Sequence, residues 1–296
     1  MQEARPHPNT APRRLVLPRG RVLKLGGRTR VMGILNLTPD SFYEPSRVSR
    51  KDVAVDQGLR MVEEGADILD LGGESTRPGS KPVDPDEQCR RLLPALEQLR
   101  GKWDGPLSVD TTNARVAQRA FEAGADVIND ISAARLDSDM PRMLSESGLP
   151  VVLMHMQGTP ETMQIDPRYG DVVKEVCKFL IGRADDLEQA GVSHDRILID
   201  PGIGFGKRLE HNLRLMSRLD VFCGLGYPVV LGASRKSFLG KIMQGEPPEQ
   251  LLEASLAVAT LAAAAGVEIV RVHDVKETSR VVKVVSAIAG TGQEGS

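Results

Sequence analysis

The chain has 296 residues, 41% of them hydrophobic, and a formal net charge of −2 at pH 7. This balance is typical of a soluble globular protein with a large core, and it offers no excess charge for nucleic acid or a membrane surface. The three cysteines, Cys89, Cys177 and Cys223, lack the spacing of a disulfide framework or a zinc site, which favours a reducing, cytoplasmic location.

The first 20 residues combine four arginines with four prolines and lack the apolar core of a signal peptide. We therefore predict a flexible N-terminal tail over residues 1–20 and one folded domain over residues 21–296. The most apolar stretch, residues 256–270, contains Gly266 and Glu268 and is shorter than the roughly 20 residues that cross a membrane. It is assigned to a buried helix and strand.

One pattern recurs along the chain: a helical stretch ends at glycine, and a short run of Val, Ile and Leu follows, as in EEGADILDL, EAGADVIND and AAGVEIVRV. Glycine relieves the left-handed helix cap, and such runs are typical of strands buried on both faces. We predict strands near residues 31–35, 68–71, 107–109, 127–128, 151–154, 197–199, 229–231 and 269–272.

Helical periodicity fills the intervals between these strands, for example in Val55, Leu59 and Val62. Eight parallel strands alternating with helices predict the α/β class and a single (β/α)8 TIM barrel. The alternative is an open doubly wound sheet, but no GxGxxG turn follows the first strand.

The active site of a barrel lies at the carboxyl ends of its strands. Polar residues follow the predicted strands in number: Asn36, Asp70, Glu74 to Arg77, Asp110, Thr111, Asn129, Asp130, His155, Asp200, Ser234 to Ser237, Arg271, His273 and Asp274. A single Asp or Asn there is more often a helix cap, yet so many at one end favour a site. His155 on its own is assigned no role.

Arg271 and His273 are two residues apart, hence on one face of the strand, and predict an anion site. Asp110, Asn129 and Asp200 offer acceptors and an amide to the edge of a fused nitrogen heterocycle. The loop 200–207 has three alternate glycines, which suit close approach to a flat ligand or simply make a flexible connector. Lys236 is either a mobile cation beside such a ligand or a solvated lysine.

Two long segments, VMGILNLTPDSF (31–42) and DLGGESTRPGS (70–80), strongly resemble the signature segments of the dihydropteroate synthase family. Further segments are similar to the rest of that pattern, in the same order: SVDT (108–111), VINDI (127–131), LMHMQGTP (153–160), DPGIGFGK (200–207), SRKS (234–237) and RVHDVKET (271–278). The resemblance runs from about residue 31 to the last helix. Long ordered motifs are far more specific than one short match.

The resemblance implies a transferase of folate biosynthesis. It would condense 6-hydroxymethyl-7,8-dihydropterin pyrophosphate with p-aminobenzoate, by dissociative substitution, to give 7,8-dihydropteroate and pyrophosphate.

The resemblance also implies catalytic roles for Lys236, Asp110 and Asp200. It implies a pterin set of Asp110, Asn129, Asp200 and Lys236, with Met154 as an apolar wall. It further implies Asn36, Thr76, Arg77, Arg271 and His273 at the pyrophosphate, and Asn36 as a ligand of Mg2+. The p-aminobenzoate pocket, where sulfonamides bind in the family, would comprise Ser75, Thr76, Pro78, Phe205, Lys236 and Ser237. Family members are usually homodimers.

Loops 38–48 and 77–84 are predicted to be mobile lids. Where the family commonly has Asp-Gly-Gly, the first loop reads Tyr43-Glu44-Pro45-Ser46, and the proline should stiffen its tip.

The sequence pattern leaves two alternative functions. A pterin-dependent methyl transfer domain has a similar Asp/Asn/Asp set but no pyrophosphate to bind, so Asn36, Arg77 and the Arg271–His273 pair argue against it. A catalytically idle pterin-binding scaffold ranks last because Lys236 and Asp110 are both present.

Overall fold

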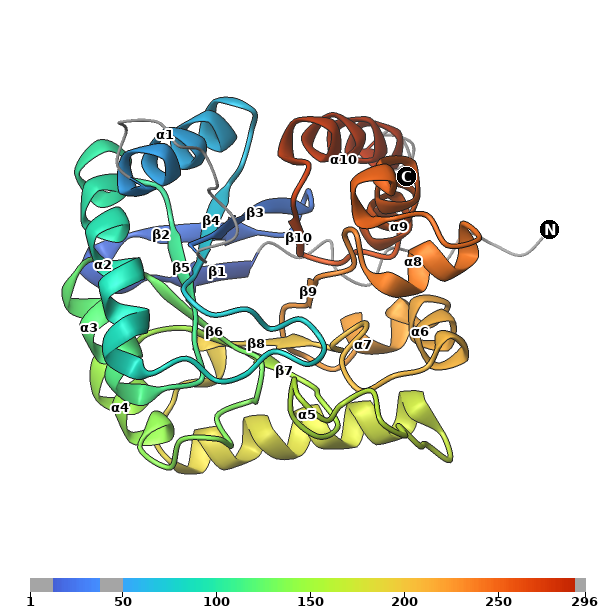
Figure 1. Ribbon diagram of the computed structural model, residues 1–296, viewed down its shortest axis with the longest axis horizontal. Coiled ribbons are helices and arrows are strands. Elements are labelled where there is room, and N and C mark those ends of the chain that lie inside the picture. The colour runs from blue at the N-terminus through green and yellow to red at the C-terminus, as the bar shows by residue number, and fades with distance from the viewer. Residues whose placement is uncertain (1–12, 38–49, 291–296) are drawn as a thin grey trace.

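The computed structural model describes residues 13–37 and 50–290, and over these residues eight parallel strands form one sheet. The strand order is β8-β7-β6-β5-β4-β3-β10-β9, and a bridge between Ile199 and Val229 joins the two ends, so the sheet closes into a barrel (Figure 1). The strands are β3 (Arg30–Asn36), β4 (Ile68–Gly72), β5 (Leu107–Asp110), β6 (Val127–Asp130), β7 (Val151–Met154), β8 (Ile197–Asp200), β9 (Val230–Leu231) and β10 (Ile269–Val272). The (β/α)8 prediction is confirmed.

Helices follow the strands and surround the barrel (Figure 1). They are α1 (Arg50–Glu63), α2 (Pro85–Lys102), α3 (Ala114–Glu122), α4 (Met140–Ser147), α5 (Val172–Gln189), α6 (Leu209–Met216), α7 (Leu219–Cys223), α8 (Ser237–Ile242), α9 (Leu252–Ala264) and α10 (Val275–Gly290). The glycines of the recurrent pattern, Gly65, Gly124, Gly148, Gly191 and Gly266, all have positive φ. They end the helices as predicted, because a left-handed residue there costs glycine no steric strain.

Alternation along the strands produces two apolar cores. Outward residues such as Leu69, Val109 and Leu153 pack under the helices. Inward residues near the amino ends of the strands form a second cluster, which includes Met32, Ile68, Val127, Val152, Leu198, Val230 and Ile269. Toward the carboxyl ends, the same inward columns continue in polar residues, among them Asp70 and Arg271. The polarity gradient along the barrel places the chemistry at one end.

The amino end of the barrel is closed by a hairpin of β1 (Arg13–Val16) and β2 (Val22–Leu25), joined through η1 (Pro18–Gly20). Its Leu15, Leu17, Leu23 and Leu25 belong to the inward apolar cluster. The prediction of a flexible tail over residues 1–20 is therefore wrong for residues 13–20, because the alternating leucines bury one face of a strand beneath the barrel. Residues 1–12 lie outside the described residues.

Two further predictions meet the described chain at its limits. The loop 38–48, with Tyr43-Glu44-Pro45-Ser46, lies outside the described residues. The apolar stretch 256–270 divides into the end of α9 and the start of β10, as predicted, but the prediction of a buried helix is wrong, because α9 buries only one face and leaves Leu261 57% exposed. No helix within residues 13–37 and 50–290 is long and apolar enough to cross a membrane.

Candidate active site

Strand register brings predicted site residues side by side at the carboxyl end of the barrel. Asn36 on β3 pairs with Gly72 on β4, Gly72 with Asp110 on β5, and Asp110 with Asn129 on β6. Farther round, Met154 on β7 pairs with Asp200 on β8. Paired residues of neighbouring strands face the same side of a sheet. Asp110, Asn129, Met154 and Asp200 are therefore all directed into the barrel mouth, and each is buried.

Arg271 is held inside the barrel by two carboxylates. Its Nε donates to Asp70 Oδ2 at 2.6 Å, and its Nη2 donates to Asp110 Oδ2 at 2.9 Å. Asn129 Nδ2 donates to the same oxygen of Asp70 at 3.1 Å. Arg271, predicted at the pyrophosphate, is thus connected directly to the residues predicted at the pterin. One network spans both halves of the site.

Burial shifts the pKa values of Asp110, of the neighbouring Asp200 and of Lys236. Removal from water raises the pKa of Asp110 to about 7, with Asp70 and Asp130 adding to the shift and Arg271 opposing it. Burial also raises the pKa of Asp200 to about 6, against a 2.7 Å hydrogen bond from the Gly202 N–H. For Lys236, burial and the charge of Arg271 lower the pKa to about 8. Such shifts concentrate at functional sites.

Lys236 and Phe205 form a stacked pair at the mouth. The Lys236 Nζ lies 3.9 Å from the centroid of the Phe205 ring. Phe205 belongs to a buried apolar cluster with Ile131, Met154, Met156 and Met163. Gly204 has φ +82°, and a Cβ there would lie 3.2 Å from Lys236 Cδ. The glycine loop therefore approaches Lys236 closely, next to an apolar wall that suits a flat ring.

His273 is neutral at physiological pH. Burial, followed by the charges of Arg271 and Arg235, lowers its pKa to about 4. Its Nδ1 lies 3.2 Å from Ser234 Oγ, and its backbone N–H donates to the same hydroxyl. Arg235 forms a bidentate ion pair with Asp274. At this end of the site the neutral His273 contributes a hydrogen bond but no charge. The positive charge comes from Arg271 and Arg235.

The remaining predicted residues lie at the rim. Ser75 and Thr76 are half-buried, whereas Arg77, Pro78 and Ser237 are exposed. The loop after β4 runs across the barrel mouth (Figure 1), where Gly79 N–H donates to Pro160 O at 3.0 Å. Ser80 Oγ donates to Ser75 Oγ at 2.9 Å. The structure thus brings the pterin set together and leaves Arg77, Pro78 and Ser237 at its edge.

Two residues at the site, Asp70 and Lys207, were not predicted from the sequence to have a role. Asp70 is fully buried and accepts from both Arg271 and Asn129 through one oxygen, while its Oδ1 has no partner among the described residues. Lys207 is 3% exposed and contacts His155. Asp70 could have been found from the sequence, because it is a carboxylate at an inward position of a buried strand. An unpaired charge is costly there, so such a residue indicates a buried partner.

The side chains fit a magnesium ion that arrives with a phosphate ligand. Within residues 13–37 and 50–290, no group of three His, Cys, Asp or Glu side chains could hold a metal ion. Mg2+ usually keeps several waters and binds through one or two protein oxygens plus substrate phosphates. Asn36, whose Oδ1 would lie 3.8 Å from a Cβ on Gly72 at the strand ends, is the residue that would supply one such oxygen.

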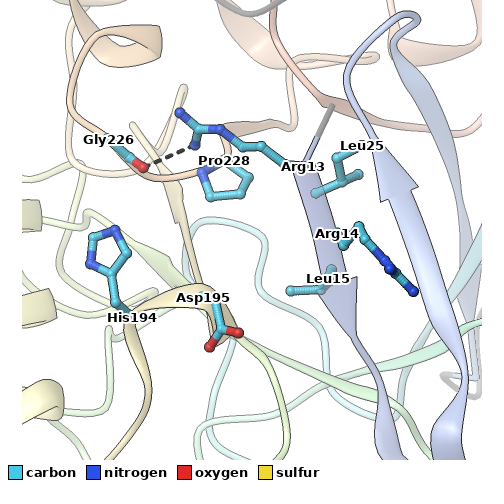
Figure 2. Close-up of a pocket in the computed structure, with 8 residues that line it drawn as sticks. All are labelled: Arg13, Arg14, Leu15, Leu25, His194, Asp195, Gly226 and Pro228. Atoms are coloured by element: carbon cyan, nitrogen blue, oxygen red, sulfur yellow. Dashed lines mark hydrogen bonds between the residues drawn. The ribbon is translucent and has the colours of Figure 1, made fainter. Parts of the chain in front are cut away.

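A separate pocket of about 340 Å3 lies at the opposite end of the barrel (Figure 2). Its lining residues come from the β1–β2 hairpin and from the segments before β8 and β9: Arg13, Arg14, Leu15, Leu25, His194, Asp195, Gly226 and Pro228. Arg13 Nη1 donates to Gly226 O at 2.9 Å (Figure 2). Because barrel chemistry belongs to the carboxyl ends of the strands, this pocket is not part of the candidate site.

Comparison with known proteins agrees with the geometry. The family described as pterin binding enzyme matches residues 32–273. The chain is 42% identical over 273 residues to a dihydropteroate synthase of Synechocystis sp., covering 92% of this chain and 94% of that protein. It resembles the structure of Xanthomonas albilineans dihydropteroate synthase with 4-aminobenzoic acid, with a TM-score of 0.88, 44% identity and coverage of 94% of this chain and 98% of that one. It also resembles the Yersinia pestis enzyme in a sulfonamide drug complex, with a TM-score of 0.87, 40% identity and coverage of 94% and 99%.

Proposed function

The chain belongs to the pterin binding enzyme family and catalyses the dihydropteroate synthase reaction, and we propose that the buried cluster at the carboxyl ends of its strands is the active site. The enzyme condenses 6-hydroxymethyl-7,8-dihydropterin pyrophosphate with p-aminobenzoate and releases 7,8-dihydropteroate and pyrophosphate. The observation that carries the placement is the network that joins Arg271 to Asp70, Asp110 and, through Asp70, Asn129.

The pterin ring binds among Asp110, Asn129 and Asp200, with Met154 as its apolar wall. A pterin edge presents N–H donors beside a carbonyl acceptor, and carboxylates with an amide complement that edge. Burial favours the proposal, because hydrogen bonds to a charged acceptor are stronger away from water. Lys236, near Asp200 and Asp110, reaches the ring from the loop between β9 and α8.

The pyrophosphate binds at the other side of the network. Arg271 uses Nε and Nη2 for carboxylates, so its Nη1 is the nitrogen that faces the anion. His273 donates a hydrogen bond from its neutral ring, and Arg77 and Thr76 reach in from the rim. Asn36 would hold Mg2+ through its amide oxygen, and the bound ion would offset the charge of the pyrophosphate.

The reaction is a dissociative substitution. The bond between the exocyclic carbon and the pyrophosphate oxygen breaks, and its electron pair leaves with the pyrophosphate. The pterin carbon is then cationic and delocalised into the ring, where Asp110 and Asp200 stabilise it electrostatically. The p-aminobenzoate nitrogen attacks this carbon and afterwards loses a proton. No covalent enzyme intermediate is required.

The second substrate binds at the rim, against Phe205 and the loop after β4. Phe205 and the stem of Lys236 supply a flat apolar surface for the aromatic ring. Ser75, Thr76, Pro78 and Ser237 surround the entrance. A sulfonamide is expected to bind here, since the Yersinia pestis relative is known in a complex with such a drug.

The placement is tested together with the reaction by measuring pyrophosphate release from the pterin pyrophosphate and Mg2+, with and without p-aminobenzoate. Release that requires the amine and is blocked by a sulfonamide is expected. The decisive variant is Asp110→Asn, which should lower this amine-dependent release strongly. Normal release by that variant would place the active site elsewhere.

We also propose that the chain forms a homodimer in the cytoplasm. α9 and α10 pack side by side, and together they expose Leu261 at 57% and Val284 at 59%. Large apolar side chains on adjacent helices are a common feature of an interface between identical subunits. The free thiols Cys89, Cys177 and Cys223 suit a reducing compartment.

A further inference from the structure

Lys207 ends the glycine loop, and its side chain turns into the protein instead of toward water. It is 3% exposed. Its Nζ donates to Gly202 O at 2.8 Å and to Phe205 O at 3.0 Å, and it lies 2.9 Å from His155 Nδ1 and 3.4 Å from His155 O. Three carbonyl oxygens and a ring nitrogen therefore surround one ammonium group, as ligands surround a bound cation.

The acceptors belong to the loop that carries the substrate contacts. Gly202 and Phe205 lie between Asp200, proposed at the pterin, and Lys207 itself. The loop is fixed to the end of β7, since the His155 N–H donates to Asp200 O at 3.0 Å. The fit is tight: a Cβ on Gly202 would lie 1.9 Å from His155 O. Tyr169 adds a hydrogen bond from its hydroxyl to Gly206 O at 2.7 Å.

Burying this lysine is unfavourable without compensation. Burial lowers the pKa of Lys207 to about 7, although Asp200 favours the charged form. Burial and the Lys207 charge lower the pKa of His155 to about 2, so its ring is neutral and can accept a hydrogen bond. A lysine without a structural purpose would keep its ammonium in solvent, because its long stem allows it.

We propose that Lys207 is a tethered cation that folds residues 200–206 into the substrate-binding form. It is a positioning residue, because its ammonium touches loop carbonyls and acts through Asp200 and Phe205. Without the ammonium, the carbonyl oxygens of Gly202 and Phe205 would face one another with no donor between them. They would repel each other and turn toward water instead. Phe205 would then leave the Lys236 ammonium on which it stacks. The proposal rests on the proposed active site and adds a residue that holds the substrate-binding loop in place.

The test replaces the tethered cation by a free one. Lys207→Ala removes the ammonium and leaves its ligands, whose distances of 2.8 to 3.4 Å suit an ammonium or potassium ion. We expect kcat/KM for p-aminobenzoate to fall roughly 100-fold, the order of loss that a misplacement of about 1 Å causes. Ammonium chloride should restore kcat/KM of Lys207→Ala to at least a tenth of the wild-type value, whereas tetramethylammonium chloride at equal ionic strength should not.

Lys174→Ala is the matched control, since that lysine is exposed on α5 and should be insensitive to either salt. The binding of 6-hydroxymethylpterin and the melting temperature of Lys207→Ala should likewise increase with ammonium. These two measurements do not require turnover, so they test the role of Lys207 even if the proposed reaction is wrong. Full activity of Lys207→Ala, or a loss that ammonium leaves unchanged, would overturn the proposal. A variant that is unfolded and stays unfolded in ammonium chloride would also count against it.

Discussion

Arg271 and Asp110 form a largely buried ion pair, with 2.9 Å between Nη2 and Oδ2, across the site where the pterin and its pyrophosphate are proposed to meet. Asp70 completes the pair by accepting from Nε at 2.6 Å. The guanidinium is thereby fixed in place before any anion binds. Preorganised charge of this kind stabilises a leaving group without reorganisation during the reaction.

Arg271→Ala should weaken the binding of the pyrophosphate-bearing pterin more than that of free hydroxymethyl pterin. It should also destabilise the fold by about 3–5 kcal/mol, because Asp70 and Asp110 would stay buried without their cation. Calorimetric titration gives the two affinities, and denaturant unfolding gives the stability.

Arg100→Ala is the control for this prediction, because it removes a buried ion pair with Asp126 at the other end of β5. It should lower stability and leave the ratio of the two pterin affinities unchanged. Equal losses for both pterins in Arg271→Ala would remove Arg271 from the anion site.

Lys236→Ala should lower turnover severely while the fold stays intact. The ammonium lies over Phe205 and interacts with Asp200 and Asp110, where the pterin and the amine are proposed to meet. Loss of one preorganised charged donor lowers kcat by about 10²–10³. Steady-state rates and circular dichroism measure the two quantities. Lys241→Ala, on an exposed position of α8, should behave as wild type. Near-normal rates in Lys236→Ala would end its catalytic role.

The barrel was predictable because helix caps and buried strands leave local marks. Gly65 and Gly124 end helices, and the Val, Ile and Leu runs after them are β4 and β6. The adjacency of Asp110 and Asn129 follows from strand order alone. Asp70 and Lys207 were harder, because their importance depends on burial and on partners far along the chain, such as Arg271 and His155. A single sequence does not reveal which charged side chains turn inward.

The hairpin at residues 13–25 was missed for a different reason. The exposed face of the two strands carries Arg14 and Lys24, and the turn between the strands contains Pro18 and Arg19, so the composition averaged over the segment resembles a loose tail. Only packing against Met32 and its neighbours distinguishes a covered strand from an extended one.

Asp110→Asn should change how stability depends on pH. Asp110 titrates in the folded protein with a pKa of about 7, so its ion pair with Arg271 is fully formed only above that pH, whereas the unfolded chain loses this proton near pH 3.8. The folded state therefore binds more protons in this window, and the free energy of unfolding falls as the pH rises from about 4 to 7. Asparagine cannot ionise, so this fall should shrink by on the order of 1 kcal/mol per pH unit. Denaturant unfolding of both proteins at several pH values measures it. Parallel curves would mean that Asp110 is not protonated in the folded state.

Leu261→Asp and Val284→Asp should each convert a dimer to a monomer without unfolding it. Both side chains are more than half exposed on adjacent helices, so a charge costs the monomer little but is buried unpaired in the interface. Light scattering after size-exclusion chromatography measures the mass. Leu136→Asp, equally exposed but before α4, is the control. A wild-type monomer, or variants that stay dimeric, would contradict the proposed surface.

Leu15→Ala should destabilise the protein and leave the activity of each folded molecule unchanged. Leu15 is 1% exposed and fills the amino end of the barrel with Met32 and Ile68. Truncating a buried leucine costs about 2–5 kcal/mol. Its neighbour Val16 is 41% exposed on the other face of β1, so Val16→Ala should change stability by less than about 0.5 kcal/mol. Denaturant unfolding and kcat per folded molecule separate the two effects. A lower kcat with unchanged stability in Leu15→Ala would contradict this prediction. It would mean that the hairpin acts through the barrel on the proposed active site, which lies at the opposite ends of the strands.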